Sequence, residues 1–540
     1  MVSELHVHAK TSKTSVLGMP KAQTMPDLLA ELAQHQGSKT AVIDEFGQIT
    51  FSDLYTRSNK LALGLSNAGV RPGDRVGLIA GNGIDWLTVF FGAGMAGATA
   101  VLFNTWVTLD ELSFLVKDSD CSIIFGSNNF NGRDFTSDLL AIMPDAGAEV
   151  IVIGDTQNAL SRTLESLLNE VAERPLKAAD PQDDAMILYT SGSTSRPKGV
   201  RLIHSDLIES GYHIGRRQGL RPGDRVFVPV PLFWAFGGAN ALPTAFTHAA
   251  TLVLPQRFDA GRALTLIEKH RCTAIYTLPS ITVALIQHID FSGQRVESLR
   301  TGLTIGSPQD FRSAVERLGI LELCNVYGST ETYGNCAVTP HDWPLDRRAI
   351  CQGMPLPGQE LRFRDTETDA LLTSGEIGLA EVGGRIFPGY FNKNSAENES
   401  AFTPDGYYRT GDLGYLDTDG SFVFVGRASE MIKRAGINVS PAEVEDVLLK
   451  FDGVSTAAVV GISDLSLGEV IVAYVTCRDQ TIDTDKLRAH CVFLLSKYKL
   501  PDHIEIVGRL PVTVTGKLQR KAVKEMARVL MSVTTQRDCA

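Results

Sequence analysis

The chain has 540 residues, of which 44% are apolar and 21% charged, and its net charge is −11. This length exceeds what one hydrophobic core organises, so it predicts a large region with internal subdomains and a smaller appended unit. The composition excludes a disordered or fibrous chain, and the acidic balance without a run of Lys or Arg argues against nucleic acid as a partner while allowing a bound nucleotide.

The N-terminal segment predicts a loose arm over residues 1–24, because Met1–Gln23 is polar and lacks the apolar core of a secretory signal. The most apolar stretch, Leu87–Phe103, contains Gly and Thr and predicts a buried helix followed by a strand, so stable membrane insertion is not expected. The eight cysteines are scattered without a C-x-x-C pair. They indicate reduced thiols and a cytoplasmic protein.

Short β-rich runs alternate with amphipathic helices, which predicts βαβ units, largely parallel sheets and an α/β fold class. The runs are Arg75–Ala80, Ser122–Phe125, Glu149–Ile153, Arg225–Val230, Thr251–Leu254 and Thr273–Tyr276. From Phe391 to Gly420 the chain has turn signals at 403–406 and 417–420 and predicts antiparallel pieces.

Beyond Arg427 the pattern predicts a small α+β unit of ordinary domain size. Its expected elements are a helix at Pro441–Lys450, strands at Thr456–Ile462 and Glu469–Thr476, a helix at Thr484–Leu495 and a strand at Ile504–Val507. A domain boundary is therefore expected close to Arg427.

Residues 189–200, with the sequence YTSGSTSRPKGV, have the composition of a loop that holds phosphate groups. Backbone N–H groups beside glycine and several hydroxyls can converge on anionic oxygens. The candidate contacts are Thr190, Ser191, Gly192, Ser193, Thr194 and Lys198. We expect a strand before the loop at 186–189 and a helix after it at Val200–Ile208. A Walker A loop is excluded because Pro197 directly precedes the lysine, and a plain polar linker is the other interpretation.

Four further segments follow this loop in a fixed order: NVYGSTET at 325–332, YRTGDL at 408–413, Gly426-Arg427 and PVTVTGKLQR at 511–520. Together they resemble the adenylate-forming superfamily of acyl-CoA synthetases, nonribosomal adenylation domains and luciferases, over residues 25–525. Several ordered motifs make a chance match far less probable than one motif would. The resemblance implies an adenylation domain at 25–427, built of α/β subdomains and a small turn-rich β subdomain, and a mobile α+β domain at 428–540.

The resemblance also implies roles at a site for ATP and Mg²⁺. Tyr327 would stack on adenine, Thr330 would donate to the α-phosphate, and Glu331 with Thr194 would hold Mg²⁺, which prefers oxygen ligands. Asp412 would accept from the ribose hydroxyls, and Arg427 would contact the same sugar. A buried structural arginine is the other interpretation of Arg427. The remaining members of the implied nucleotide site are Gly306, Ser307, Pro308, Asn325, Gly328 and Ser329.

Lys517 is the implied catalytic lysine, because an ammonium stabilises the charge that forms when a carboxylate attacks the α-phosphorus. The resulting acyl-adenylate would then pass its acyl group to the thiol of coenzyme A. The family rotates its small domain between these steps, which would bring Lys433 and Gly436 to the site, with Gly436 along the pantetheine tunnel. Ser429 stands at the hinge position, where the family usually has Asp or Lys.

The implied acyl pocket consists of aromatic or small residues: Trp234, Ala235, Phe236, Gly237, Gly238, Ile305, Gly306, Thr332, Tyr333 and Gly334. No acidic residue stands in its first segment to hold a substrate ammonium. A hydrophobic aryl or alkyl acid without an amino group is therefore favoured. Trp234 replaces a histidine that is frequent in the family, and a bulky gate or plain aromatic packing explains it equally well. Ser195 replaces a usual glycine.

The expected function is thus ATP-dependent activation of a small-molecule carboxylic acid and its transfer to coenzyme A. Two alternatives remain open: an acyl carrier protein as the acceptor, and a nucleotide-binding homologue without catalysis. The second is disfavoured because Lys517, Glu331 and Asp412 are all present. The sequence leaves a homodimer open.

Overall fold

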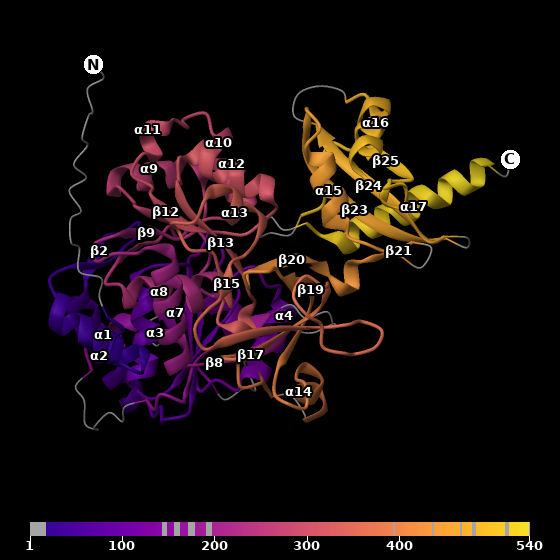
Figure 1. Cartoon of the computed structure of the whole chain (residues 1–540). Helices are drawn as coiled ribbons and strands as arrows, with labels where there is room; N and C mark the ends of the chain where they lie inside the picture. The colour runs from indigo at the N-terminus through magenta and orange to yellow at the C-terminus, as the bar shows by residue number, and fades with distance from the viewer. Residues whose placement is uncertain are drawn as a thin grey trace, which may run out of the picture.

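The computed structural model describes residues 18–142, 148–155, 162–170, 179–190, 197–392, 395–434, 437–464, 467–477, 482–512 and 518–538. Their strands form four sheets. Three sheets belong to a larger lobe, and the fourth belongs to a smaller lobe formed by the elements from β21 onward (Figure 1).

A seven-stranded sheet is central to the first part of the larger lobe. Its order is β18 (Tyr390–Phe391), β8 (Lys198–Ile203), β7 (Asp184–Thr190), β4 (Thr99–Leu102), β3 (Arg75–Ile79), β5 (Ile123–Ser127) and β6 (Glu149–Ile153). The five strands from β7 to β6 are parallel, and β8 and β18 add to the edge antiparallel. All four side chains of β4 are buried, as expected for a parallel strand covered on both faces.

A nine-stranded sheet forms the second part of this lobe. Its order is β15 (Met354–Pro355), β14 (Ala337–Val338), β13 (Glu322–Tyr327), β12 (Thr301–Thr304), β11 (Ala274–Tyr276), β9 (Arg225–Phe227), β10 (Thr251–Val253), β1 (Thr40–Ile43) and β2 (Gln48–Thr50). The strands from β13 to β1 are parallel. The six strands expected from the sequence all occur in these two sheets, and the α/β fold class is confirmed.

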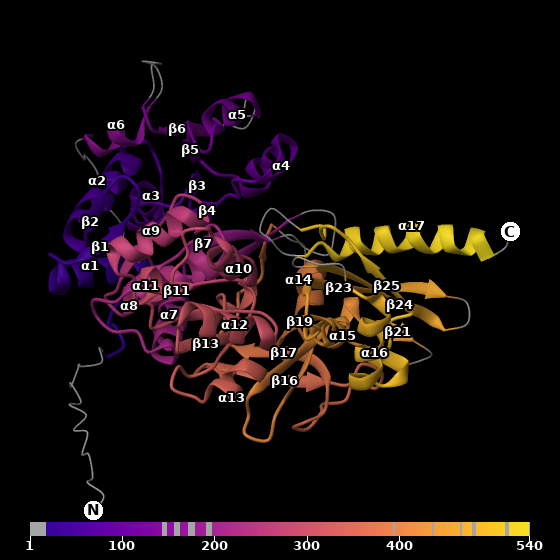
Figure 2. The same ribbon diagram turned by 90° about the horizontal axis from the view of Figure 1, so that it is seen from above.

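Helices cover the faces of both sheets (Figures 1 and 2). The helices of the larger lobe are α1 (Met25–Gln36), α2 (Phe51–Asn67), α3 (Ile84–Met95), α4 (Leu109–Ser119), α5 (Phe135–Ile142), α6 (Leu164–Leu168), α7 (His204–Gln218), α8 (Leu242–Thr247), α9 (Ala260–His270), α10 (Pro279–Gln287), α11 (Gly293–Val296), α12 (Pro308–Leu318), α13 (Leu345–Ile350) and α14 (Ser395–Ala401), the last of which contacts β19 of the third sheet. The expected helix and strand of Leu87–Phe103 are α3 and β4. No helix of the described part of the chain is long and apolar enough to cross a bilayer.

The third sheet is antiparallel and contains β16 (Gln359–Arg364), β17 (Gly378–Gly384), β19 (Tyr408–Leu416) and β20 (Phe422–Arg427). Both predicted turns close with the N–H of residue four bonded to the carbonyl of residue one, Gly406 to Thr403 and Gly420 to Asp417. Glycine occupies the left-handed position in each, with φ of +89° and +83°.

The smaller lobe has a sheet of β22 (Ile437–Val439), β21 (Ile432–Arg434), β24 (Gly468–Cys477), β23 (Val454–Asp464) and β25 (His503–Ile506), with helices α15 (Pro441–Leu449), α16 (Thr484–Leu494) and α17 (Arg520–Asp538). The elements expected beyond Arg427 are present, and α17 was not anticipated. Figures 1 and 2 both show α17 pointing away from the larger lobe, with its C-terminal end projecting at the outer edge of the smaller lobe.

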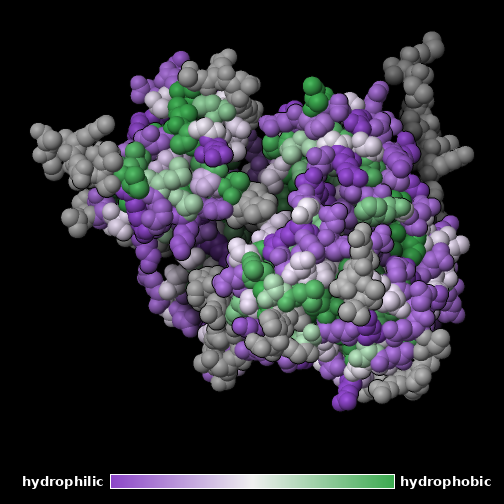
Figure 3. Space-filling model, turned by 180° about the vertical axis from the view of Figure 1, so that it is seen from behind, coloured by the Kyte–Doolittle hydropathy of each residue, from purple (hydrophilic) through white to green (hydrophobic). Residues whose placement is uncertain are grey.

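Viewed from behind, hydrophilic residues cover most of the surface and hydrophobic residues form small separate patches (Figure 3). This is usual for the exposed surface of a globular protein. The same view shows a hollow between the smaller lobe and the larger lobe.

Candidate active site

The candidate site lies where the carboxyl ends of the parallel strands of both large sheets approach each other. Asn82, in the loop after β3, joins the two sheets: its Nδ2 donates to the carbonyl of Val230 at 3.0 Å, and the N–H of Leu232 donates to its Oδ1 at 2.8 Å. Tyr327 ends β13, and Thr190 ends β7. Ligands of open α/β sheets bind at this edge, so the fold places the predicted residues where a ligand is expected.

Tyr327, Asp412 and Arg427 form one cluster, although up to 100 positions separate them in the chain. The Tyr327 hydroxyl donates to Asp412 Oδ2 at 2.6 Å, and Arg427 Nε lies 2.8 Å from Asp412 Oδ1. Antiparallel pairing of β19 with β20 sets Asp412 opposite Arg427. The Tyr327 ring rests against Phe422, with 4.4 Å between centroids, which fixes the plane of the ring.

Burial dominates the electrostatics of Asp412. Desolvation raises the pKa of its carboxyl, although the charge of Arg427 and the hydroxyl of Tyr327 both act to lower it. Oδ1 accepts no hydrogen bond within the described residues, because Arg427 approaches it as an ion pair without hydrogen-bond geometry. A buried carboxylate oxygen with this acceptor position open fits a ligand that carries hydroxyl groups.

Glu331 and Lys198 form a second group around Tyr390. Glu331 is 8% exposed and lies in the single 3₁₀ turn η2 (Thr330–Thr332) after β13. Its Oε1 accepts from the Tyr390 hydroxyl at 3.0 Å, while Lys198 Nζ lies 4.9 Å from the centroid of the Tyr390 ring. Glu331 is also close enough to Asp412 for its charge to contribute to the raised pKa of that carboxyl, after burial as the main cause. The two groups therefore belong to one site.

Mg²⁺ fits this donor set. No cluster of three or more His, Cys, Asp or Glu suited to a metal occurs in the described part of the chain. Mg²⁺ is commonly held by one or two carboxylates together with substrate phosphates rather than by a cage of protein ligands. Glu331 meets that requirement because only Oε1 has a hydrogen-bond partner among the described residues.

The strands on either side of the predicted phosphate loop, β7 and β8, pair with each other, and a strand rather than a helix follows the loop. Thr190 is paired with Lys198 across antiparallel β7 and β8, so the predicted helix at Val200–Ile208 is wrong for 200–203. Val200 and Leu202 are buried while Arg201 is partly exposed, the period-two pattern of a strand, and α7 begins at His204. Predicted residues Ser191, Gly192, Ser193, Thr194, Gly436 and Lys517 lie outside the described residues, as does Ser195.

The predicted acyl wall begins with a π-helix, η1 (Ala235–Ala241), which is rare and typical of functional sites. Gly237 and Gly238 pack on the carbonyls of Pro231 and Leu232, where an added Cβ would lie only 2.2 Å from each oxygen. Phe236 packs on Tyr276 with 5.0 Å between the ring centroids. The wall is therefore close-packed and aromatic.

The other end of the predicted wall is equally enclosed. Tyr333 has no exposed surface, and its hydroxyl accepts from the N–H of Ile203 at 3.3 Å. Gly334, at φ +89°, faces Asn240, so a side chain there would meet both strain and contact. Thr332 is buried and its hydroxyl donates to the Ser329 carbonyl at 3.1 Å.

A cavity of about 230 Å³ adjoins this wall at Trp234, the one predicted acyl-pocket residue that lines it. Trp106 packs edge-on against Trp234 and Phe233, at 5.1 and 5.3 Å. The other lining residues include Phe130, Val230, Phe258, Leu278 and Ile281. Arg257 is the one charged side chain among the described lining residues. Sequence reasoning missed Trp106 and Arg257 because they belong to no motif and meet Trp234 only in the fold.

The remaining predicted residues have these positions. Gly306 (φ +138°) and Ile305 are exposed after β12, and Ser307 caps α12, with Pro308 as its first residue. Asn325 is buried and donates to the Arg348 carbonyl at 3.2 Å. Gly328 and Ser329 form the turn between β13 and η2. Ser429 is exposed in the 3₁₀ turn η3 (Ala428–Glu430), and Lys433 lies in β21.

Comparison with known proteins assigns the chain to a family. The family described as AMP-binding enzyme matches residues 29–391, and the AMP-binding enzyme C-terminal domain matches residues 443–517. The chain belongs to the AMP-binding enzyme family. It is similar to the sulfoacetate–CoA ligase of Cupriavidus necator, at 32% identity over 92% of this chain and 96% of that protein. It is also similar to a mitochondrial medium-chain acyl-CoA ligase of Danio rerio, at 28% identity over 88% and 83% of the two chains.

Among solved structures, the chain is similar to the anthranilate CoA ligase AuaEII in complex with anthranoyl-AMP. The TM-score is 0.86, at 26% identity over 96% of this chain and all of that one. This AMP-binding enzyme is therefore an AMP-forming acid–CoA ligase of the adenylate-forming superfamily. It uses ATP, Mg²⁺ and coenzyme A and acts on a small-molecule carboxylic acid through an acyl-adenylate.

Proposed function

We propose that this enzyme activates a hydrophobic aryl or alkyl acid without an amino group. The observation that supports the proposal is the lining beside Trp234, where an apolar cavity of about 230 Å³ has no acidic side chain among its described residues. Phe236 and Tyr276 continue the apolar character on the acyl wall. A substrate ammonium would lose its hydration there without a counter-charge, at a cost of several kcal/mol.

In this proposal the cluster around Asp412 binds the nucleoside. The Tyr327 ring stacks on adenine, and Oδ1 of Asp412, which is ion-paired with Arg427 but accepts no hydrogen bond from the described residues, accepts from the ribose hydroxyls. Thr330 and the phosphate-loop residues donate to the phosphates, together with Lys198. Glu331 and Thr194 would hold Mg²⁺, which would neutralise phosphate charge while the acyl-adenylate forms and pyrophosphate leaves.

Lys517 supplies the remaining charge near the α-phosphorus, where the incoming carboxylate and the phosphate are both anionic. The smaller lobe, assigned here to 428–540, then turns about Ser429 so that Lys433 and Gly436 face the thioester step. The larger lobe, 25–427, keeps the acyl-adenylate during this motion. Reduced cysteines agree with a cytoplasmic location, which is part of the same proposal.

The substrate class is tested by measuring pyrophosphate release with ATP, Mg²⁺ and a panel of aryl, medium-chain, amino and sulfonated acids. We expect release with uncharged aryl or alkyl acids and little with amino acids. Preference for an amino acid or a sulfonated acid would overturn the substrate assignment.

Supplying coenzyme A and a phosphopantetheinylated carrier protein together identifies the acceptor, and we expect coenzyme A to be acylated.

Replacement of Lys517 by Ala tests the catalytic assignment. We expect pyrophosphate release to fall by about 10² or more, because a preorganised charge at the reacting phosphorus is typically worth this factor. ATP should still bind, since the cluster at Tyr327, Asp412 and Arg427 is untouched. Unchanged turnover of Lys517→Ala in the pyrophosphate assay would refute the assignment.

A further inference from the structure

Tyr390 contacts both of the groups to which the proposed function assigns phosphate and metal binding. Its hydroxyl donates to Glu331 Oε1 at 3.0 Å. The face of its ring lies beside Lys198, with Nζ 4.9 Å from the centroid, which is within cation–π distance. One side chain thus links a carboxylate that follows β13 with a lysine that begins β8.

The backbone holds Tyr390 firmly in this position. Strand β18 pairs antiparallel with β8, so that Tyr390 is opposite Val200 and its neighbour is opposite Gly199. The N–H of Tyr390 donates to Asn398 Oδ1 at 2.8 Å. Three residues earlier, the N–H of Phe387 donates to the carbonyl of Glu331 at 2.9 Å. The segment 387–391 therefore contacts the main chain and the side chain of Glu331 and the strand that bears Lys198.

The contacts of Tyr390 leave Glu331 able to bind a cation and Lys198 able to bind an anion. A neutral phenol that donates to Oε1 orients the Glu331 carboxylate and leaves its charge and Oε2 for a cation. The π face holds the Lys198 ammonium without neutralising it, whereas a carboxylate partner would. No described carboxylate forms an ion pair with Lys198. Hydrogen bonds that orient metal-binding carboxylates commonly decide metal affinity.

We propose that Tyr390 is a positioning residue that orients Glu331 toward Mg²⁺ and Lys198 toward the phosphates of ATP. This proposal rests on the proposed function for the metal role of Glu331. No motif in the sequence marks Tyr390, because its partners are 59 and 192 positions away and meet it only across β18 and β8.

The test separates the hydroxyl from the ring. Tyr390→Phe removes the donor to Glu331 and keeps the ring beside Lys198, whereas Tyr390→Leu removes both. Tyr407 offers a matched control, because its hydroxyl also donates to a glutamate, Glu360, and a cation, Arg362, also lies over its ring. Binding is measured by titrating Mn²⁺, detected by electron paramagnetic resonance, into the full-length enzyme with α,β-methylene-ATP, and thermal midpoints are recorded in parallel.

We expect Tyr390→Phe to raise the Mn²⁺ concentration at half-saturation about tenfold, as is typical when a hydrogen bond to a metal ligand is lost. The affinity of Tyr390→Phe for the ATP analogue at saturating Mn²⁺ should stay within about twofold of that of the unmodified enzyme. The affinity of Tyr390→Leu for the analogue should be about three- to fivefold lower than that of Tyr390→Phe, because the cation–π contact is lost as well. Tyr407→Phe should leave both quantities unchanged.

Glu331→Gln distinguishes failure of this inference from failure of the proposed function. If Glu331→Gln shifts the Mn²⁺ midpoint and Tyr390→Phe does not, Tyr390 has no positioning role and the metal assignment stands. If neither variant shifts the midpoint, Glu331 does not bind the metal and both proposals fail. An equal shift in Tyr407→Phe would show a general effect of removing a tyrosine hydroxyl and would also overturn the inference.

Discussion

At the residue scale, burial of the Asp412 carboxylate costs the folded protein free energy, while ligand binding requires the same carboxylate. Burial raises the pKa of its carboxyl, which means that the folded chain disfavours the charged form. Arg427 and Tyr327 partly offset this cost, yet one oxygen is still without a hydrogen-bond partner among the described residues. A buried acceptor left open at such a cost is typical of a ligand-binding atom.

Asp412→Asn is therefore expected to weaken ATP binding without unfolding the protein. The amide loses a charge-assisted hydrogen bond to the ribose, worth about 1.5 kcal/mol or more, so the Kd for ATP should rise about tenfold. The thermal midpoint should stay the same or rise, because the variant no longer buries a carboxylate. Calorimetric titration with ATP and a melting curve check both expectations.

Tyr327→Phe serves as the comparison for this variant. It removes the hydroxyl that donates to Asp412 and keeps the ring packed on Phe422, so the loss of ATP affinity should be smaller than for Asp412→Asn. An Asp412→Asn enzyme that binds ATP as tightly as the unmodified enzyme would contradict the ribose role.

The sequence predicted residues of this site well where a motif contains them, and poorly where only the fold supplies them. Tyr327, Asp412 and Arg427 stand in three separate motifs, and the structure brings them into one cluster. Tyr390 and Trp106 were missed because each acts through contacts across sheets or loops, and single-residue contacts of high sequence separation leave no periodic signal.

At the element scale, local pattern was a good guide to parallel strands and a poor guide to pairing partners. Buried apolar runs between turn signals identified β3, β5 and β6. The same local information predicted a helix at 200–203, where the hairpin with β7 forms β8 instead. Tertiary pairing overrides helical propensity at such a position.

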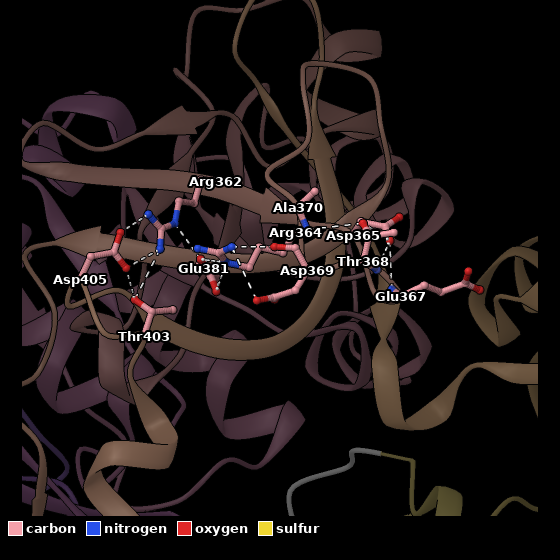
Figure 4. Close-up of polar contacts among 10 residues, drawn as sticks. All are labelled: Arg362, Arg364, Asp365, Glu367, Thr368, Asp369, Ala370, Glu381, Thr403 and Asp405. Carbon is pink, nitrogen blue, oxygen red and sulfur yellow. Dashed lines mark hydrogen bonds and ion pairs between the residues drawn. The ribbon is translucent and has the colours of Figure 1, made fainter.

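The antiparallel sheet β16–β17–β19–β20 carries an ionic cluster centred on Glu381 (Figure 4). Glu381 is 3% exposed and accepts from Arg362 Nε at 2.7 Å and from Arg364 Nε at 3.0 Å. Arg362 also pairs with Asp405, and its guanidinium carbon lies 3.6 Å from the centroid of the Tyr407 ring. Two guanidinium groups thus share one buried carboxylate.

Glu381→Gln should destabilise the protein by about 2 kcal/mol, measured as the shift of the urea unfolding midpoint at pH 7. Removing one partner of a fully buried pair costs about 3–5 kcal/mol, and the cost here is lower because the side chains of Arg362 and Arg364 are 18% and 21% exposed. A variant as stable as the unmodified protein would show that the cluster contributes no net stability.

Asp405 in the same cluster should respond to acid. The hydrogen bond from Arg362 lowers the pKa of its carboxyl, so its contribution is present above the unfolded-state pKa of about 3.9 and is lost as the pH falls toward the lower folded-state value. Asp405→Asn should therefore lower the stability of the folded protein at pH 7. It should lower that stability less in strong acid, where the unmodified carboxyl is protonated and has also lost its charge.

At the scale of the whole molecule, the two lobes meet at a surface that the sequence did not reveal. Gln309 on α12 donates to the carbonyl of Leu449 on α15 at 3.1 Å, and the Ser440 hydroxyl donates to the Val425 carbonyl at 2.8 Å. Each lobe could be outlined from its own hydrophobic pattern, because a core leaves periodic apolar positions. A polar surface between lobes leaves no such pattern.

Asp446 on α15 is a titratable group at this surface. Burial raises the pKa of its carboxyl to about 6, and the second cause is the charge of Asp310 on α12 of the other lobe. The folded pKa lies above the unfolded value, so the stabilising contribution is complete below about pH 4 and is lost as the pH rises through about 6. Above pH 6 two carboxylates repel each other between the lobes.

Asp446→Asn should therefore raise the thermal midpoint at pH 8 and have a smaller effect at pH 5, where the unmodified side chain is mostly protonated. We expect a gain of about 2 °C at pH 8, since 1 kcal/mol moves the midpoint by roughly 2–4 °C in chains of 150–250 residues and by less in longer ones. Asp452→Asn, at an exposed position after α15, is the matched control and should show no difference between the two pH values. A lower midpoint for Asp446→Asn at pH 8 would mean that the charged carboxylate stabilises the contact between the lobes instead of opposing it.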